Sequence, residues 1–256
     1  VRKRKQTFRF VDVPSKPVPS LLRGFSAPVK LTVDLSDREL EFLMANDSDL
    51  FNRWQAANNY AMRTLIRLIK ARTEERRPAQ AVAYARALGA SLRNEELEPA
   101  YRAELLKLPT ENDIAREIAK NVDPDAIHRA RKQLLRIIGE TLGAELEDIY
   151  KSFDDGGKFS PDAASAGRRA LRNAALTLLS ARNTAADKVR LADHYWKASN
   201  MTDAAHALYL LSARGGTDAK KALDDFHERW KGDHLVIDTW FAAQAMSPLA
   251  GTLSRV

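Results

Sequence analysis

Residues 49–72 read DLFNRWQAANNYAMRTLIRLIKAR, and this stretch decides the fold class. Its apolar side chains recur every three or four residues, which places them on one stripe of a helix. The stripe consists of Leu50, Trp54, Ala57, Ala61, Leu65 and Leu68. The opposite face carries Asn52, Arg53, Asn59, Arg63 and Arg67. The pattern predicts an amphipathic helix from about Asp49 to Arg72, with Trp54 in the core.

The helical period extends from about Asp37 to the end of the chain. Asp123-Pro124 predicts a helix start, because Asp is a favoured cap and Pro is favoured at the first helical position. A second buried stripe follows, formed by Ile127, Ala130, Leu134, Ile138 and Leu142. Ser160-Pro161-Asp162 predicts a further start. Breaks fall at Arg77-Pro78, Leu108-Pro109, Asp154-Asp155-Gly156-Gly157, Arg214-Gly215-Gly216 and Lys231-Gly232. We therefore expect a mostly α protein of roughly ten helices, arranged as an α-solenoid-like stack of antiparallel helices.

The first 34 residues have a different pattern. Phe8, Phe10 and Val13 arrive at near-alternating spacing, which is typical of a strand. Prolines at positions 14, 17, 19 and 28 exclude a helix. A second strand-like run covers residues 27–33. Two or three strands cannot form a stable sheet alone, so we expect their partner strands to lie upstream.

Composition excludes several classes of protein. The 256 residues contain no cysteine, which excludes disulfides and thiolate sites and favours a cytoplasmic location. No apolar run approaches the roughly 20 residues that a membrane span requires. The net charge of +7 arises from 41 basic and 34 acidic residues spread along the chain. Only Arg2 to Lys5 form a basic run, and no aromatic residues are interleaved with it, so nucleic-acid binding is not expected.

A metal site is not expected either. Five histidines are present, at His128, His194, His206, His227 and His234. A zinc-peptidase helix needs two histidines four residues apart with a glutamate after the first. His227-Glu228 comes nearest, but Lys231 occupies the position of the second ligand. A helix end with a cationic side chain explains this segment better.

Other candidate residues are better explained as structural. Asp154-Asp155-Gly156-Gly157 resembles half of a calcium loop but lacks the closing glutamate, so a turn is expected. Three acidic pairs point in divergent directions and suit a solvated surface: Glu74-Glu75, Glu95-Glu96 and Asp224-Asp225. Arg168, Arg169 and Arg172 could bind a carboxylate or phosphate, but pairing with acidic residues of a neighbouring helix is favoured. No catalytic, cofactor-binding or metal-binding residue is assigned.

Several stretches, in order, resemble bacterial aminopeptidase N, the zinc-dependent alanyl aminopeptidases of the gluzincin class. They are Pro17-Val-Pro-Ser-Leu-Leu-Arg-Gly-Phe-Ser-Ala-Pro-Val-Lys-Leu31, Asp49-Leu-Phe-Asn-Arg-Trp-Gln-Ala-Ala57, Leu108-Pro-Thr-Glu-Asn112, Arg169-Ala-Leu-Arg-Asn173, Ala198-Ser-Asn-Met-Thr-Asp-Ala204 and Asp238-Thr-Trp-Phe-Ala-Ala-Gln-Ala-Met-Ser-Pro248. The resemblance covers nearly the whole chain.

The resemblance implies a division into two parts. Residues 1–34 would be the last strands of a small β-sandwich, and residues 35–256 a helical C-terminal domain, incomplete at its C-terminal end. In that family the helical domain closes over the active site and restricts access to it. The zinc motif and the Gly-Ala-Met-Glu-Asn segment that holds the substrate amino terminus belong upstream and are absent from this sequence.

A non-catalytic segment of a zinc-dependent, peptide-cleaving aminopeptidase is therefore expected. Zinc would belong to the parent enzyme, and the chain alone would be inactive. Its partners would be the remaining domains, through which it meets peptide substrates, or a second copy that covers apolar edges left open. The alternative is an unrelated helical-repeat adaptor that binds protein or RNA along a basic concave face. That alternative leaves the proline-rich opening unexplained.

Overall fold

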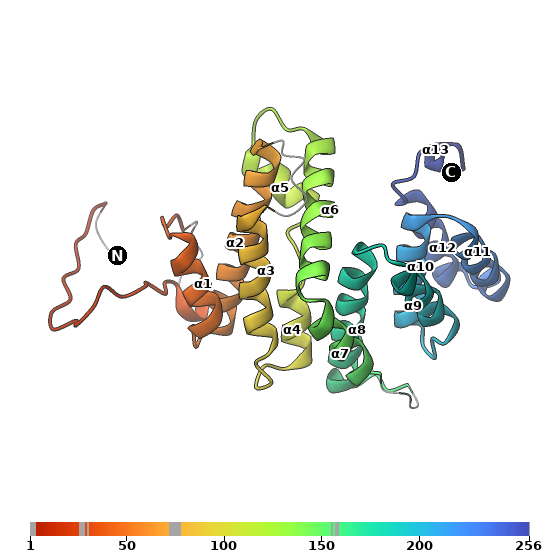
Figure 1. Ribbon diagram of the computed structural model, residues 1–256, viewed down its shortest axis with the longest axis horizontal. Coiled ribbons are helices and arrows are strands. Elements are labelled where there is room, and N and C mark those ends of the chain that lie inside the picture. The colour runs from red at the N-terminus through yellow and green to blue at the C-terminus, as the bar shows by residue number, and fades with distance from the viewer. Residues whose placement is uncertain are drawn as a thin grey trace.

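The computed structural model describes residues 4–25, 29, 31–71, 78–154, 156 and 159–255. Regular structure in this part of the chain is helical (Figure 1). The elements are η1 (Arg23–Phe25), α1 (Asp37–Asn46), α2 (Leu50–Ala71), α3 (Ala79–Leu92), α4 (Pro99–Leu105), α5 (Glu111–Ile118), α6 (Pro124–Thr141), α7 (Gly143–Ser152), α8 (Ala163–Ala181), α9 (Ala185–Trp196), α10 (Met201–Arg214), α11 (Thr217–Trp230), α12 (His234–Ala245) and α13 (Thr252–Arg255). The predicted mostly α class is confirmed.

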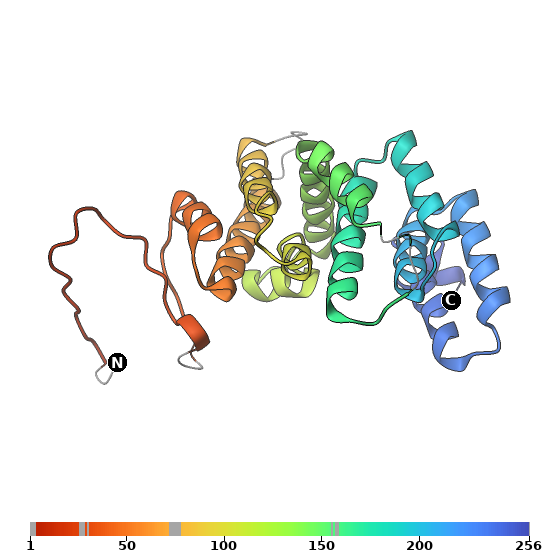
Figure 2. The ribbon, with the colours of Figure 1, turned by 90° about the horizontal axis from the view of Figure 1, so that it is seen from below.

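The helices form an elongated stack. Figures 1 and 2 show α1 to α8 side by side in one row, with α9 to α13 grouped beyond α8. Neighbours in sequence pack together, as α1 does with α2, α7 with α8, and α9 with α10. The α8 helix also contacts α4 and α6, which precede it by many residues. The predicted solenoid-like arrangement is confirmed.

Two hydrophobic clusters hold the stack together. The larger one extends from α1 to α8 and includes the fully buried Leu65, Leu88 and Leu134. The smaller one joins α8 to α12 and centres on Leu208 and Phe226. Leu176 of α8 belongs to the smaller cluster, so α8 contributes to both.

The predicted stripe of α2 is confirmed over most of its length. Ala57, Ala61, Leu65 and Leu68 are buried. Trp54 is only partly buried and packs against the edge of the larger cluster. Leu50 is 49% exposed, because it is the first residue of the helix and lies beyond the packed face. Its place in the core was wrongly predicted.

Arg53 also departs from the predicted pattern. It was assigned to the polar face, yet it is buried at 8% exposure. Its Nε donates to the carbonyl of Met44 at 2.9 Å, and its Nη2 donates to that of Ala45 at 2.6 Å. These carbonyls lie at the C-terminal end of α1, where helix carbonyls lack partners within the helix. Arg53 therefore joins α1 to α2.

The structure confirms both predicted helix starts, that of α6 and that of α8, and shows which residue caps each helix. Asp123 caps α6 by accepting from the backbone N–H of Ala126 at 3.0 Å, and Pro124 occupies the first turn. The five predicted stripe residues of α6 and its C-terminal cap are all buried. At α8 the cap is Asp162, which accepts from the N–H of Ser165. Ser160 instead donates to the Asp162 carboxylate.

More short helices are present than the sequence predicted. The described residues contain thirteen α-helices, including the seven-residue α4 and the eight-residue α5. Pro99 occupies the first turn of α4, a start that the sequence analysis did not identify, and Pro109, which was interpreted only as a break, precedes α5. The signal for α5 was present in Thr110 and Asp113, which form a reciprocal capping box.

The strands expected before residue 34 are not observed in the described residues. The described residues of this segment form no regular structure apart from η1, and Phe8 and Phe10 are 60% and 82% exposed. Residues 27, 28 and 30 of the second predicted strand lie outside the described residues. A strand needs a neighbouring strand for its backbone hydrogen bonds, and none lies beside this segment in the described part. No described helix is long and apolar enough to span a membrane.

Candidate functional site

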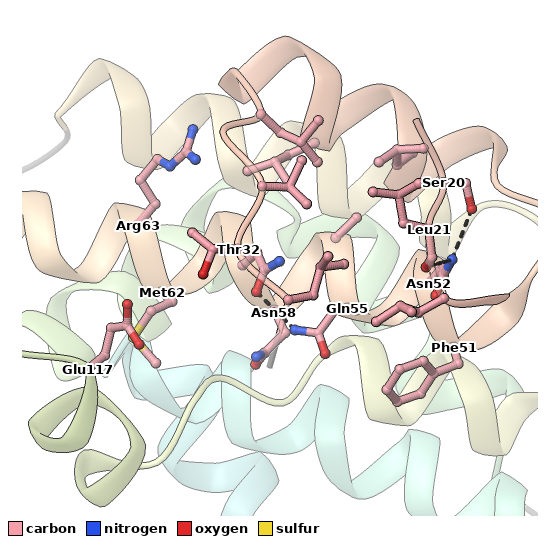
Figure 3. Close-up of a pocket in the computed structure, with 18 of the residues that line it drawn as sticks. Ser20, Leu21, Thr32, Phe51, Asn52, Gln55, Asn58, Met62, Arg63 and Glu117 are labelled. Atoms are coloured by element: carbon pink, nitrogen blue, oxygen red, sulfur yellow. Dashed lines mark hydrogen bonds between the residues drawn. The ribbon is translucent and has the colours of Figure 1, made fainter. Parts of the chain in front are cut away.

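A large cavity lies between the N-terminal segment and the helical stack. Its volume is about 1130 Å³, and it lies between residues 19–22 and 31–35 on one side and α2 and α5 on the other (Figure 3). We call it the junction groove. Val18 packs beside it on the larger hydrophobic cluster, so the groove is bounded by a segment that is anchored to the helices.

A set of polar contacts anchors the N-terminal segment. Arg23 donates through Nη1 to Oδ1 of Asp47 at 2.9 Å and through Nη2 to Oγ of Ser48 at 2.7 Å. The Gly24 N–H donates to Asp49 at 3.2 Å. Asn52 donates through Nδ2 to both the Ser20 hydroxyl and the Leu21 carbonyl, each at 2.9 Å. We call these contacts the junction latch.

The latch is built on the start of α2. Oδ1 of Asp49 accepts from the N–H of Asn52 at 3.0 Å, which is the contact of a helix N-cap. This hydrogen bond lowers the pKa of Asp49 below its ordinary value, with smaller contributions from the Gly24 N–H and Arg23. Asp47 ends α1, and its side chain is almost fully buried. The loop from α1 to α2 therefore presents its carboxylates to the segment around Arg23.

The far end of α1 is fixed by a second ionic cluster. Asp37 accepts from Arg63 at 2.9 Å and also pairs with Arg67, both on α2. The hydrogen bond from Arg67 is the main cause of the lowered pKa of Asp37. Together with Arg53, these pairs hold the α1–α2 hairpin at both ends.

A smaller cavity of about 420 Å³ lies where α7, α8, α9 and the start of α10 meet. His194 is 3% exposed, and its Nδ1 lies 3.0 Å from the hydroxyl of Tyr150. Burial lowers the pKa of His194 to about 4, and Arg172 adds to this effect. Arg172 lies over the ring of Tyr150 and pairs with Asp154 at 2.7 Å. Tyr150 also packs on both hydrophobic clusters, so this polar site marks their seam.

The other histidines are dispersed. His128 pairs with Glu111, His206 contacts the Thr177 hydroxyl at 2.9 Å, and His227 packs on Trp240. His234 begins α12. Across the residues the structure describes, no three His, Cys, Asp or Glu side chains are grouped to hold a metal ion.

The three arginines Arg168, Arg169 and Arg172 have different environments and do not form one site. Arg172 pairs with Asp154 and lies 3.8 Å from Asp203, which agrees with the expected pairing to acidic residues. Arg169 instead donates to the Ser160 carbonyl and lies over the ring of Phe159. Arg168 is exposed.

The acidic pairs differ from one another as well. Glu95 and Glu96 both lie in a turn after α3 and are both exposed, in agreement with a solvated surface. Asp224 pairs with Lys220, whereas Asp225 accepts from the buried Tyr195 hydroxyl at 2.8 Å. Asp225 therefore has a structural contact and is not only a solvated surface residue.

Glu74-Glu75 lie outside the described residues, as do Arg2 and Lys3 of the basic run. Asp154 follows the end of α7, and the turn predicted at residues 154–157 stays a prediction, because Asp155 and Gly157 lie outside the described residues.

Comparison with known protein families finds a family match for most of the chain. Residues 37–256 match DUF3458_C, a domain of unknown function described as ARM repeats. The chain belongs to the DUF3458_C family. In this DUF3458_C chain, residues 1–34 match a second family, DUF3458, described as a domain of unknown function with an Ig-like fold. The two matches meet at the junction groove.

Three curated relatives of this DUF3458_C chain are named aminopeptidase N. The protein of Caulobacter vibrioides is 41% identical over 252 residues, that of Escherichia coli 37% over 257 residues, and that of Haemophilus influenzae 32% over 254 residues. These alignments cover 97–100% of the chain but only 28–29% of the relatives. The predicted resemblance is confirmed, and the chain spans less than a third of the length of these relatives.

A solved structure agrees with the DUF3458_C fold. The crystal structure of Legionella pneumophila aminopeptidase A in complex with aspartic acid is similar with a TM-score of 0.82 at 26% identity. The similarity covers 97% of this chain and 30% of that one. The helical stack is therefore a fold found within an aminopeptidase.

Sequence reasoning missed the latch residues. Arg23 was quoted only as part of a recognised stretch, Asn52 was assigned only to the polar face of a helix, and Asp47 was not singled out. A local signal existed for Asp49, an acidic residue directly before a helical stripe. No local signal indicates that Arg23 reaches Asp47, because the two residues lie in different elements.

Proposed function

We infer that this chain is a non-catalytic C-terminal part of a zinc-dependent aminopeptidase that removes N-terminal residues from peptides. One observation carries the proposal: three proteins named aminopeptidase N align with essentially the whole chain while extending far beyond it. Residues 1–34 would complete a small β-sandwich, and residues 35–256 would form the helical domain. The positions of the two family matches support this division.

The helical domain would cap the active site and limit access to it. Its helices form an elongated stack, and polar contacts join α1 to α2 at both ends. A domain held together in this way would keep its shape as a cover over the active site. The parent enzyme would then trim short, unfolded peptides but not the N-terminus of a compact folded protein. The measurement is the rate of N-terminal residue release from a folded domain and from its unfolded, alkylated form. Equal rates would contradict the access role.

The parent activity has a separate test. The longer protein should release chromophore from an alanyl chromogenic substrate, and a zinc chelator should abolish the release. Zinc would be held by residues outside this chain. Absence of hydrolysis by the longer protein, or activity that resists the chelator, would overturn the assignment.

The remaining domains are the proposed partners. Large apolar side chains are exposed at the end of the stack, where Leu235, Met246 and Leu253 are 86%, 73% and 94% exposed. Such surface favours association, either with the other domains or with a second copy. Light scattering that shows a monodisperse monomer, with no binding of a hydrophobic dye, would contradict this. A cytoplasmic location stays a prediction.

A further inference from the structure

The wall of the junction groove carries a row of carboxamide side chains. Asn52, Gln55, Asn58 and Asn59 all line the groove from α2. Figure 3 shows three of them along the same helix, followed by Met62. The helical spacing of the row continues into the apolar Met62 and Ile66, which also line the groove. Towards this end of α2, the groove is also lined by the basic side chains of Arg63, Arg67 and Lys70.

Part of this row has spare hydrogen-bonding capacity. The Nδ2 amino group of Asn52 already donates both of its hydrogen bonds within the junction latch. Gln55 donates to Oδ1 of Asn59 at 2.9 Å, which leaves the Gln55 carbonyl and the Asn59 amino group for other partners. Asn58 forms no hydrogen bond with the described part of the chain. A carboxamide offers both a donor and an acceptor, which is the same pair that a peptide bond offers.

The spacing of the row suits an extended chain. Gln55 and Asn59 are one helical turn apart, so their side chains leave α2 about 6 Å apart along its axis. An extended strand repeats the main-chain groups of one edge every two residues, about 6.7 Å. The two side chains are thus attached to α2 at nearly the repeat of a peptide backbone, while their carboxamide tips meet in their own 2.9 Å hydrogen bond.

Size and charge favour the same ligand. The groove, at about 1130 Å³, exceeds the roughly 300–1,000 Å³ of small-molecule pockets. Its ionic groups are largely neutralised by one another, since Arg63 and Arg67 pair with Asp37, and Arg116 lies 3.5 Å from Asp113. A groove without a dominant charge does not select side chains by charge. Recognition would fall to the peptide backbone.

We propose that the junction groove binds the extended tail of a peptide substrate, through hydrogen bonds from Gln55, Asn58 and Asn59 to its main chain. Met62 and Ile66 contact its side chains without selecting a sequence. The proposal rests on the proposed function, because that function supplies the peptide and the reason for sequence tolerance.

The test measures fluorescence anisotropy of labelled decapeptides with the 256-residue chain. Three unrelated sequences, acetylated and amidated at their ends, are compared with versions N-methylated at alternate backbone nitrogens. Capped ends keep the measurement independent of any site that needs a free amino terminus. We expect the three sequences to bind within about threefold of one another, and each methylated version at least tenfold more weakly.

Substitutions in the junction groove test whether the peptide binds there. Asn58→Ala and Asn59→Ala should each weaken binding about fivefold, the value of one hydrogen bond. Gln80→Ala on α3 is the matched control, because Gln80 does not line the groove, and it should leave affinity unchanged. Both asparagines are at least partly exposed, and unchanged circular dichroism would confirm folding. Absence of binding, equal affinity of all variants, or affinity that follows side-chain sequence would overturn the proposal.

The longer enzyme separates this proposal from the proposed function. Asn58→Ala should raise KM for a decapeptide severalfold and leave KM for an alanyl chromogenic substrate unchanged. If the enzyme cleaves both substrates and the variant has no effect, the groove proposal fails while the function stands. If capped peptides bind the chain but not the longer protein, a segment of the enzyme itself occupies the groove, and the substrate assignment is wrong. If the longer protein lacks peptidase activity, the function fails even where capped peptides bind.

Discussion

Arg23 lies 24 residues before Asp47, and its Nη1 donates a 2.9 Å hydrogen bond to Oδ1 of that residue. The Asp47 side chain is 1% exposed, whereas that of Arg23 is 47% exposed. An exposed cation thus reaches a buried carboxylate at the end of α1. This contact links the segment that matches the Ig-like family to the helical stack.

Removal of Arg23 should loosen the junction. In Arg23→Ala, a buried carboxylate loses a charged donor, and we expect a loss of about 1–2 kcal/mol in local stability. Hydrogen–deuterium exchange at the Gly24 N–H, which bonds to Asp49, reports this opening. Lys16→Ala is the control, because Lys16 is 87% exposed and its pair with Glu39 is 3.4 Å long. Equal exchange in the two variants would show that the latch is not formed.

Close packing of α6 on α8 predicts intolerance of a methyl group at Gly139. A Cβ built there would lie 2.2 Å from the backbone carbonyl oxygen of Leu178. A backbone oxygen cannot move without displacing α8, so Gly139→Ala should cost more than about 2 kcal/mol despite the better helix propensity of Ala. Urea unfolding measures the loss.

Gly232 provides the matched control for that substitution. A Cβ at Gly232 meets nothing within 4 Å. Gly232→Ala should therefore change the free energy of unfolding by less than about 0.5 kcal/mol. Comparable losses at both glycines would contradict the close approach of α6 and α8.

Burial of His194 predicts loss of stability in mild acid. Its pKa is lowered in the folded protein from 6.5 to about 4, so between these values the unfolded chain binds a proton that the folded chain does not. Stability is therefore full above pH 6.5 and decreases as the pH falls through this window. We expect a loss of about 2 kcal/mol from pH 6.5 to 4.5. Burial of part of its side chain also lowers the pKa of His206, which acts in the same direction.

The variant His194→Gln should flatten this dependence. Its free energy of unfolding should vary less between pH 6.5 and 4.5 than that of the unsubstituted chain. An identical pH profile in His194→Gln would mean that His194 is not held neutral by burial.

The stripe of α2 predicts a gradient of mutational effects. Leu65 is 0% exposed, and Leu65→Ala should cost about 2–5 kcal/mol. Leu50→Ala, at a 49% exposed position, should cost less than about 0.5 kcal/mol. Trp54→Ala should fall between them, at about 1–3 kcal/mol, since Trp54 is partly buried. Denaturant unfolding orders the three variants, and a larger loss for Leu50 than for Leu65 would contradict the packing.

Sequence alone predicted the elements that obey local rules. The periodicity of α2 and α6 and the capping residue Asp123 depend on neighbours within a few positions, and the structure confirms them. The exposure of Leu50 and the burial of Arg53 depend on where α1 lies, which no local pattern contains. The strands expected before residue 34 depend on partners outside the described residues.

The candidate site was predicted less well for the same reason. The junction groove combines residues from three separate parts of the chain, and its latch joins Arg23 to Asp47 across 24 positions. Resemblance to a family identified the stretch that contains Arg23 but not Asp47, and only the fold brings the two residues together. His194 illustrates this too, because its low pKa arises from burial between α7, α8 and α9.

The central claim is that this chain contributes structure but not chemistry to an aminopeptidase. The most direct test is hydrolysis of an alanyl chromogenic substrate by the purified 256-residue chain, with its mass of 28.6 kDa verified, in the presence and absence of a zinc chelator. We predict no hydrolysis under either condition. Hydrolysis that the chelator abolishes would show that this chain carries a catalytic metal site, and it would contradict the account.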